Sequence, residues 1–411
     1  MLVLTGADLV LPDRVLHAGT LSIADGRIVE IRAEHAGPHA SSFAFHGHTI
    51  VPGFIDVHVH GVLGTDTLDE GNPVATLAAA LPRFGVTAFC PTTIACSPTA
   101  LRGVLAQVRE CRQAPRPLAA RVLPAHLESN FINPDYRGAQ PLACLRTCGR
   151  PHGSPAEGAD SGVFTAAAIL QAIEDHAPDV GIVTLAPELE GALDLIAWLR
   201  ALGVRVSLGH SGATYDQAVA AIAAGATQAT HLFNRMPPLH HREPGLAGAV
   251  LQHDDVAAEV ICDGAHVHPG MVRALVAAKT AARVMAISDG TAAAGLPPGS
   301  TASLGGQRIT AGSHVAVLDD GTMAGTVLTM DAAFRRLTAE MGFPLSDAAA
   351  MCATTPARQL GLVGHGLIAE GAAADLTVLD RGGCVVQTYV GGRLVYARRA
   401  LEGNSPAAPA V

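Results

Sequence analysis

The sequence predicts an α/β protein in which a closed parallel (β/α)8 barrel of the TIM type is joined to a small β-sandwich domain built from both termini. Two observations lead to this fold class. Between residues 52 and 365, apolar strand-like segments alternate with stretches rich in alanine and leucine, which is typical of a parallel sheet covered by helices. The two ends of the chain instead carry short alternating segments and glycine turns, as antiparallel strands do.

Eight segments of the middle region have the length and composition of buried strands. They are GFIDVHV (53–59), TAFCPTT (87–93), VLPAHLE (122–128), IVTLAP (182–187), RVSLGH (205–210), QATHLF (228–233), AAEVICDG (257–264) and VMAISDG (284–290). Helical stretches such as YDQAVAAIAAGA (215–226) and MVRALVAAKTAA (271–282) separate them. Eight such alternations favour a closed barrel over an open sheet, so we expect a barrel over residues 52–365.

Turn signals mark the strands at both ends of the chain. Asp25-Gly26 lies between alternating segments in TLSIADGRIVEIRA, and Gly391-Gly392 takes the same place in CVVQTYVGGRLVYA. Such pairs are typical of β-hairpin turns. We therefore expect residues 1–51 and 366–402 to pair as one small β-domain, followed by a tail at 403–411.

Composition excludes several classes of partner. The formal net charge of −9 and the absence of a basic stripe argue against nucleic acid. The sequence has no run of about eighteen uncharged apolar residues, so we expect no membrane span. The N-terminal MLVLTGADLVLP lacks the basic region that an export signal would have before its apolar residues.

The eight cysteines are scattered, and Cys144 and Cys148 have no second pair with which to bind zinc. We therefore expect reduced thiols in a cytoplasmic protein.

Six residues that can bind metals fall at the carboxyl ends of predicted strands, where a barrel of this kind has its active site. They are His58, His60, Glu128, His210, His231 and Asp289. Taken singly, each has a plain structural explanation, such as a hydrogen-bonded core histidine or a helix cap. Together they are costly to bury at one barrel mouth unless a cation pairs them. Imidazole and carboxylate are ligands of zinc and similar divalent ions.

Several motifs carry a resemblance to a known family. PGFIDVHVHG (52–61), THLFN (230–234) and SDG (288–290) resemble the amidohydrolase superfamily. A second set of segments is similar to the N-acetylglucosamine-6-phosphate deacetylases within it. This set comprises VTLAPE (183–188), LGHSGATYDQA (208–218), HLFNRMPPLHHREPGLAGAV (231–250), DGAHVHP (263–269) and SDGTAAAGLPPG (288–299).

The resemblance implies a role for each metal-capable residue. Glu128, His210 and His231 are expected to bind the main metal, and His58 and His60 a second one. We expect zinc, although iron, manganese and cobalt tolerate the same ligands, and one or two ions fit the pattern. Asp289 is expected to accept a proton from the attacking water and return it to the leaving amine.

The lysine content of the sequence bears on which residue could bridge the two metal positions that the resemblance implies. Many amidohydrolases bridge two metals with a carboxylated lysine. The only lysine here, Lys279, lies in the middle of a predicted helix, away from every strand end. Glu128 is therefore the best candidate for a bridging carboxylate.

The resemblance also implies substrate contacts, and the sequence departs from the family at several of them. His266 is expected to contact the sugar, Arg242 the phosphate, and Asn234 the substrate beside them. Gln140 stands where the family usually has a histidine that polarises the amide carbonyl. Arg235 stands where it usually has an alanine beside the phosphate. Ser129-Asn130 replaces a usual Gly-Pro after Glu128.

These changes leave the metal-capable residues and Asp289 intact. We expect a deacetylase acting on an N-acetyl amino sugar 6-phosphate, and a homodimer, as is common in the family. Three alternatives stay open: the galactosamine epimer of the substrate, another anionic N-acyl compound such as an N-acyl amino acid, and a sugar-phosphate-binding protein without catalysis.

Overall fold

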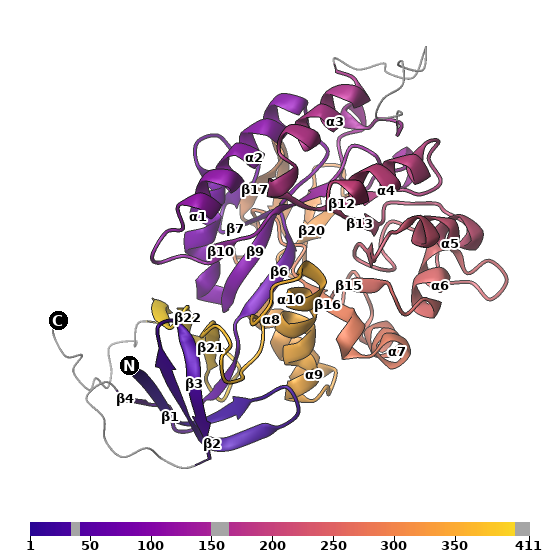
Figure 1. Cartoon of the computed structure of the whole chain (residues 1–411). Helices are drawn as coiled ribbons and strands as arrows, with labels where there is room; N and C mark the ends of the chain where they lie inside the picture. The colour runs from indigo at the N-terminus through magenta and orange to yellow at the C-terminus, as the bar shows by residue number, and fades with distance from the viewer. Residues whose placement is uncertain (34–41, 149–163, 399–411) are drawn as a thin grey trace.

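Eight parallel strands form a barrel at the centre of the molecule (Figure 1). The computed structural model describes residues 1–33, 42–148 and 164–398. The barrel strands are β6 (Phe54–Val59), β9 (Val86–Thr93), β11 (Ala125–Glu128), β12 (Val180–Leu185), β13 (Arg205–Leu208), β14 (Gln228–Ala229), β15 (Ala257–Ile261) and β16 (Val284–Ile287). One of them lies in each of the eight predicted segments, so the predicted barrel is confirmed. Every residue of β6, β9, β12 and β15 is buried, as parallel strands covered by helices require.

The barrel closes at its carboxyl end through backbone contacts between its first and last strands. β6 pairs with β9 on one side. On the other side, the amide of Asp289 donates to the carbonyl oxygen of His58 at 3.0 Å. The amides of His60 and Gly61 both donate to the carbonyl oxygen of Gly290, at 2.8 and 2.9 Å. The closure is thus made by residues of the predicted site.

Helices between the strands form the outer layer (Figure 1). They are α1 (Pro73–Ala80), α2 (Pro98–Gln113), α3 (Ala166–Asp175), α4 (Ala192–Ala201), α5 (Tyr215–Ala224), α6 (Gly245–Gln252), α7 (Pro269–Lys279), α8 (Met330–Arg335), α9 (Leu345–Ala349) and α10 (Thr355–Leu360). Several begin at side-chain caps. Ser97, Thr165 and Thr214 each accept a hydrogen bond from the backbone three residues ahead. Such caps satisfy amides that have no partner within the helix.

Strands from both ends of the chain form the small domain, as expected. They are β1 (Leu2–Val10), β2 (Val15–Ala24), β3 (Arg27–Arg32), β4 (Ser42–Ala44), β5 (Thr49–Pro52), β21 (Leu376–Leu379), β22 (Val385–Val390) and β23 (Arg393–Ala397). They make one sheet, in which antiparallel pairing of β5 with β21 joins the two ends. Both predicted hairpin turns occur, and Gly26 lies against Gly391. The two hairpins of this sheet therefore meet at their turns.

On this arrangement we propose the domain division expected above, near residues 52 and 365. The expected tail at 403–411 lies outside the described residues.

Asp375 ties the small domain to the barrel. Its carboxylate accepts hydrogen bonds from Arg121 beside the barrel at 3.1 Å and from the amide of Gly391 at 2.7 Å. The ring of His365 lies 2.8 Å from its other oxygen. Burial alone raises the pKa of Asp375, but its bonds to His365 and Arg121 outweigh burial and hold that pKa below its ordinary value.

A four-stranded antiparallel sheet was not predicted. It comprises β17 (Thr301–Leu304), β18 (Gln307–Ala311), β19 (Val315–Leu318) and β20 (Met323–Thr326), inserted between β16 and α8. The side chain of Gln307 donates to the carbonyl oxygen of Ala139 at 2.9 Å. Leu304, Met323 and Gly325 line the pocket at the barrel mouth. The insertion therefore forms one wall of the site.

None of the described helices has both the length and the apolar character needed to cross a membrane. All eight cysteines are free thiols, as expected.

Candidate active site

Glu128, His210 and His231 bring one carboxylate and two imidazoles together at the carboxyl ends of β11, β13 and β14. Glu128 is the last residue of β11, while the histidines follow β13 and β14 by two residues. Oε1 of Glu128 lies 2.8 Å from Nε2 of His210 and 2.9 Å from Nε2 of His231. All three side chains are buried. Burial alone raises the pKa of Glu128, but the neighbouring histidines, His210 foremost, outweigh burial and hold it well below its ordinary value.

His58 and His60 form a second pair of imidazoles beside Glu128. They lie two residues apart, so both side chains point to the same face of the chain. Their Nε2 atoms are 3.2 Å apart. Oε2 of Glu128 lies 3.3 Å from Nε2 of His60, and Oε1 lies 3.7 Å from Nε2 of His58. Glu128 therefore lies between the two histidine pairs, as a bridging carboxylate must.

The donor atoms of these residues fit a divalent cation. Nε2 of His210 and Nε2 of His231 are only 3.0 Å apart, and both face the same carboxylate oxygen. Burial lowers the pKa of His58 to about 4, which leaves its imidazole neutral. Imidazole nitrogens and carboxylate oxygens that converge within a few ångströms are the donor set of zinc and related ions.

Asp289 completes the cluster from the end of β16. Its Oδ1 lies 3.4 Å from Nε2 of His58 and 3.4 Å from Nε2 of His60. Burial alone raises the pKa of Asp289, but the hydrogen bond with His60 and the neighbouring histidines lower it to about 2. An ionised carboxylate in this position can accept a proton.

Three residues of the cluster have a left-handed backbone. φ is 49° at His210, 29° at His231 and 46° at Asp289. Residues other than glycine rarely adopt positive φ, and such strained residues concentrate at functional sites. Backbone hydrogen bonds hold each one in place. For example, the amide of Thr326 donates to the carbonyl oxygen of Asp289 at 3.0 Å.

Lys279 does not reach this cluster. It is buried at the carboxyl end of α7, whereas we expected it in the middle of a helix. Its Nζ donates to the carbonyl oxygen of His253 at 2.5 Å. The only lysine of the chain therefore has a structural partner far from the barrel mouth.

A pocket of about 420 Å³ opens above the cluster. Four of the five predicted substrate-binding residues line it, namely His266, Asn234, Arg235 and Gln140. Nδ1 of His266 donates a hydrogen bond to Oδ2 of Asp263 at 2.6 Å, which leaves Nε2 of His266 as the acceptor on that ring. Such a pocket has the usual size of a small-molecule site.

The two residues that depart from the family pattern in this pocket have different surroundings. Gln140 is buried: its Nε2 donates to Oε2 of Glu128, and its Oε1 accepts from the amide of Ala95 at 2.7 Å. Arg235 extends past Gly138 and makes one long hydrogen bond, 3.4 Å, to the carbonyl oxygen of Met323. In the described part of the chain, no carboxylate lies within 4.0 Å of its guanidinium, so its charge is available to an anion.

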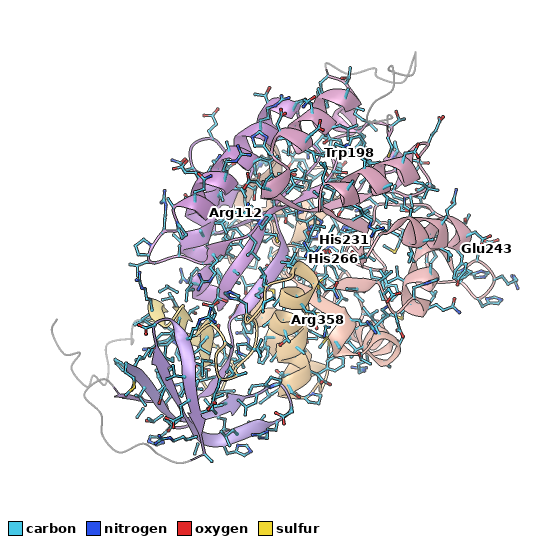
Figure 2. All side chains as sticks on the ribbon, in the orientation of Figure 1. Arg112, Trp198, His231, Glu243, His266 and Arg358 are labelled. Atoms are coloured by element: carbon cyan, nitrogen blue, oxygen red, sulfur yellow. The ribbon has the colours of Figure 1, made fainter. Side chains whose placement is uncertain are left out.

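Arg242 does not line this pocket. It is exposed on the loop before α6, where its Nη1 lies 3.0 Å from Nε2 of His241. It borders a separate hollow of about 800 Å³ beside α5. Figure 2 places the adjacent Glu243 at the outer edge of the molecule, whereas His231 and His266 lie near its centre. Within one chain, the structure does not bring Arg242 to the site.

Ser129 and Asn130 point away from the pocket. Oγ of Ser129 donates to the carbonyl oxygen of Thr184 at 2.5 Å. Nδ2 of Asn130 donates to the carbonyl oxygens of Cys96 and Cys144 at 2.8 and 2.7 Å. The expectation that all departures from the family pattern face the substrate is therefore wrong for these two residues, which brace loops around Glu128.

Sequence analysis did not identify two further buried residues near the cluster. Glu259 lies in the middle of β15 and His126 in the middle of β11. Both are fully buried. A carboxylate within the apolar segment AAEVICDG was itself a signal, since buried carboxylates need partners.

A (β/α)8 barrel with imidazoles and carboxylates converging at its mouth defines the class of metal-dependent hydrolases. The chain belongs to the amidohydrolase family, whose profile matches residues 49–395. This family implies a divalent metal.

Two curated proteins and one solved structure are similar to the chain over most of its length. The chain is 31% identical to N-acetylglucosamine-6-phosphate deacetylase of Bacillus subtilis, over 96% of this chain and 97% of that protein. It is 35% identical to N-acetylgalactosamine-6-phosphate deacetylase of Escherichia coli O157:H7, over 84% and 87%. A mutant N-acetylglucosamine-6-phosphate deacetylase from Mycobacterium smegmatis, solved with N-acetyl-D-glucosamine-6-phosphate, superposes with a TM-score of 0.84. It is 32% identical, over 96% of this chain and 99% of that one.

Proposed function

We propose that the protein is a metal-dependent deacetylase that hydrolyses an N-acetylhexosamine 6-phosphate to the amino sugar phosphate and acetate. The observation that carries this proposal is the convergence of Glu128, His210 and His231 beside Asp289 in the pocket at the barrel mouth. Such a cluster supports hydrolysis more than binding alone, because a protein that only binds its ligand does not need a carboxylate such as Asp289 as a base beside the cation.

Each residue of the cluster has a distinct task. Glu128, His210 and His231 would hold one cation, which we take to be zinc, and His58 and His60 with Glu128 would hold a second. A bound divalent ion lowers the pKa of water and polarises the amide carbonyl. Asp289 accepts the proton of the attacking water and then donates it to the nitrogen of the leaving amine.

The pocket residues orient the sugar and its phosphate. Nε2 of His266 is available to a sugar hydroxyl, and Asn234 lies beside it in the pocket wall. Arg235 supplies the positive charge for the phosphate within the same chain, because it lines the pocket and has no carboxylate partner among the described residues. Gln140 does not take the place of a cationic histidine. Its amide orients Glu128 instead.

The sugar epimer is the first alternative, since relatives named for glucosamine and for galactosamine have similar identity to this chain. Other anionic N-acyl compounds, including N-acyl amino acids, are the second. The homodimer and the cytoplasmic location stay predictions.

The test is to assay the zinc-loaded protein against both N-acetylhexosamine 6-phosphates and their unphosphorylated forms. We expect kcat/KM of about 10⁴ M⁻¹s⁻¹ or more for one phosphorylated epimer. No hydrolysis of either epimer would reject the proposal and favour a binding protein.

A further inference from the structure

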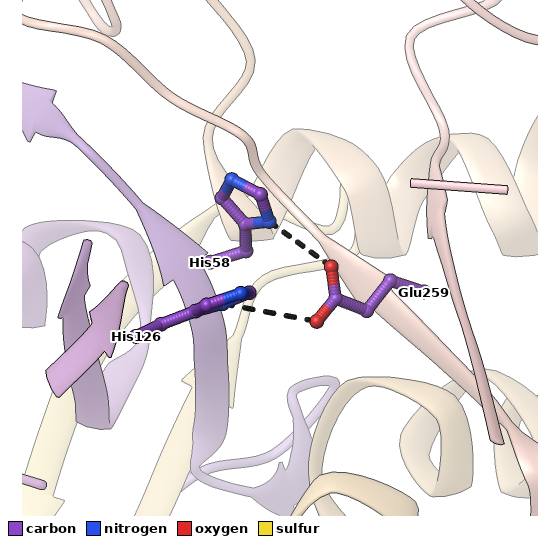
Figure 3. A group of neighbouring side chains, drawn as sticks. All are labelled: His58, His126 and Glu259. Carbon is purple, nitrogen blue, oxygen red and sulfur yellow. Dashed lines mark hydrogen bonds and ion pairs between the residues drawn. The ribbon is translucent and has the colours of Figure 1, made fainter. Parts of the chain in front are cut away.

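Glu259 lies directly beneath the cluster, out of contact with the pocket. Its side chain is fully buried within the barrel. Oε2 lies 3.0 Å from Nδ1 of His58, and Oε1 lies 3.8 Å from Nδ1 of His126 (Figure 3). In the described part of the chain, these are the two side chains that pair with it, and the backbone amide of His231 also donates to Oε2 at 3.4 Å.

His58, His126 and Glu259 have the composition of a third cation site, but the hydrogen bonds of His126 argue against one. Nδ1 of His126 lies 2.9 Å from the carbonyl oxygen of Val57, which can only accept, so this nitrogen carries the proton. Nε2 must then accept from the hydroxyl of Thr184 at 2.8 Å. His126 therefore has no lone pair left for an ion.

A chain of hydroxyls fixes this arrangement. Thr184 donates to His126 and accepts from Thr230 at 2.7 Å, and Thr230 accepts from Ser207 at 2.6 Å. Because the carbonyl oxygen of Val57 can only accept, it determines the donor and the acceptor of every hydrogen bond in this chain. The ring of His126 is thus held rigidly, with its centre 4.6 Å from that of the His58 ring.

The same reasoning fixes the ring of His58. An ionised Glu259 can only accept, so Nδ1 of His58 then carries the proton and Nε2 carries the lone pair. Nε2 faces His60, Glu128 and Asp289, at 3.2, 3.7 and 3.4 Å. The lone pair therefore points into the cluster.

We propose that Glu259 is a positioning residue for the second cation. It holds His58 in the Nδ1–H tautomer and aims Nε2 at the ion that His58 shares with His60. This proposal rests on the two-cation arrangement of the proposed function. Carboxylates behind ligating histidines change metal affinity by about 10–100-fold when they are removed.

The experiment measures metal binding and needs no substrate. Apoprotein of wild type, Glu259→Gln, His58→Ala and the double variant is titrated with Zn²⁺, and bound zinc is measured after equilibrium dialysis. We expect Glu259→Gln to weaken one of two bound ions by about 10–100-fold and to leave the other unchanged. Glu259→Gln should add nothing further in the His58→Ala background, because the effect passes through His58.

Asp179→Asn is the matched control for loss of a buried carboxylate. Asp179 is buried, and it pairs with Arg109 and Arg112 of α2, away from the cluster. The Asp179→Asn substitution should lower the melting temperature without changing zinc binding.

Three results would overturn the inference: unchanged affinities in Glu259→Gln, an equal loss at both ions, or a further loss in the double variant. Wild-type protein that binds no zinc would reject the proposed function as well. Failure of the role of Glu259 alone is therefore distinguishable from failure of the proposed function.

Discussion

Nε2 of His210 and Nε2 of His231 lie 3.0 Å apart and face the same oxygen of Glu128. Three metal-ligand atoms this close together need a positive charge among them, which a bound cation supplies. We expect His210→Ala to remove the most tightly bound ion. Metal content after dialysis measures this loss, with the exposed His240→Ala as the control. Full metal retention in His210→Ala would show that the cation lies elsewhere.

Removal of the metal should also lower stability, because the ion binds only the folded chain. A chelator is expected to lower the Tm of wild type, and added Zn²⁺ should restore it. The same treatment should leave the Tm of His210→Ala almost unchanged. An equal shift in both proteins would point to a different site of action for the chelator.

Asp289→Asn tests the proton acceptor. Asparagine keeps the size of the side chain but cannot accept the proton, so we expect kcat to fall by about 10²–10⁴-fold. Zinc content should stay close to that of wild type, because five other side chains hold the ions. Unchanged turnover with full metal content would contradict the role of Asp289.

Arg235→Ala tests the phosphate contact. A lost hydrogen bond between charged groups is worth about 1.5–3 kcal/mol, so we expect kcat/KM for the phosphorylated substrate to fall about 10–100-fold. Hydrolysis of the unphosphorylated sugar should change little. Arg242→Ala is the comparison, since this exposed arginine lies outside the pocket. A larger loss in Arg242→Ala than in Arg235→Ala would overturn the assignment.

Asp375→Asn tests the link between the barrel and the small domain. We expect the free energy of unfolding to fall by about 2 kcal/mol at pH 7, because charged hydrogen bonds to a buried carboxylate are lost. The folded-state pKa of Asp375 lies below its ordinary value, so its contribution is present above about pH 4 and is lost as pH falls further. The difference between variant and wild type should shrink accordingly.

Denaturant unfolding at pH 7 and pH 3 measures this difference. The exposed Asp13→Asn removes a surface ion pair with Arg14 and should change stability by less than about 0.5 kcal/mol. A difference for Asp375→Asn that persists undiminished at pH 3 would contradict the role of its charge.

The barrel was predictable because its strands are buried on both faces and read as apolar segments that end in polar residues. His210, His231 and Asp289 could be placed together for the same reason: the carboxyl ends of parallel strands share one rim. The hairpins followed from Asp25-Gly26 and Gly391-Gly392, where only a few residue types adopt the backbone of a tight turn.

Other features depend on contacts that local sequence does not contain. The strands β17–β20 have only four or five residues each, which is too short for a sequence pattern to identify them. The motif that contains Arg242 predicted a contact with the substrate phosphate. Arg242 instead lies on an exposed loop, outside the pocket of its own chain. The side chains of Ser129 and Asn130 bind distant carbonyl oxygens, which no spacing along the chain reveals.

Pairing of β5 with β21 has a consequence for synthesis on the ribosome. The first five strands emerge early, but the partner that completes their sheet, Leu376–Leu379, is made more than three hundred residues later. Until then β5 presents one unpaired edge, and unpaired edges invite aggregation. The barrel can form meanwhile, because its strands and helices are contiguous. The small domain is therefore the last part of the protein to assemble, and the nascent chain needs protection at its beginning until its end is made.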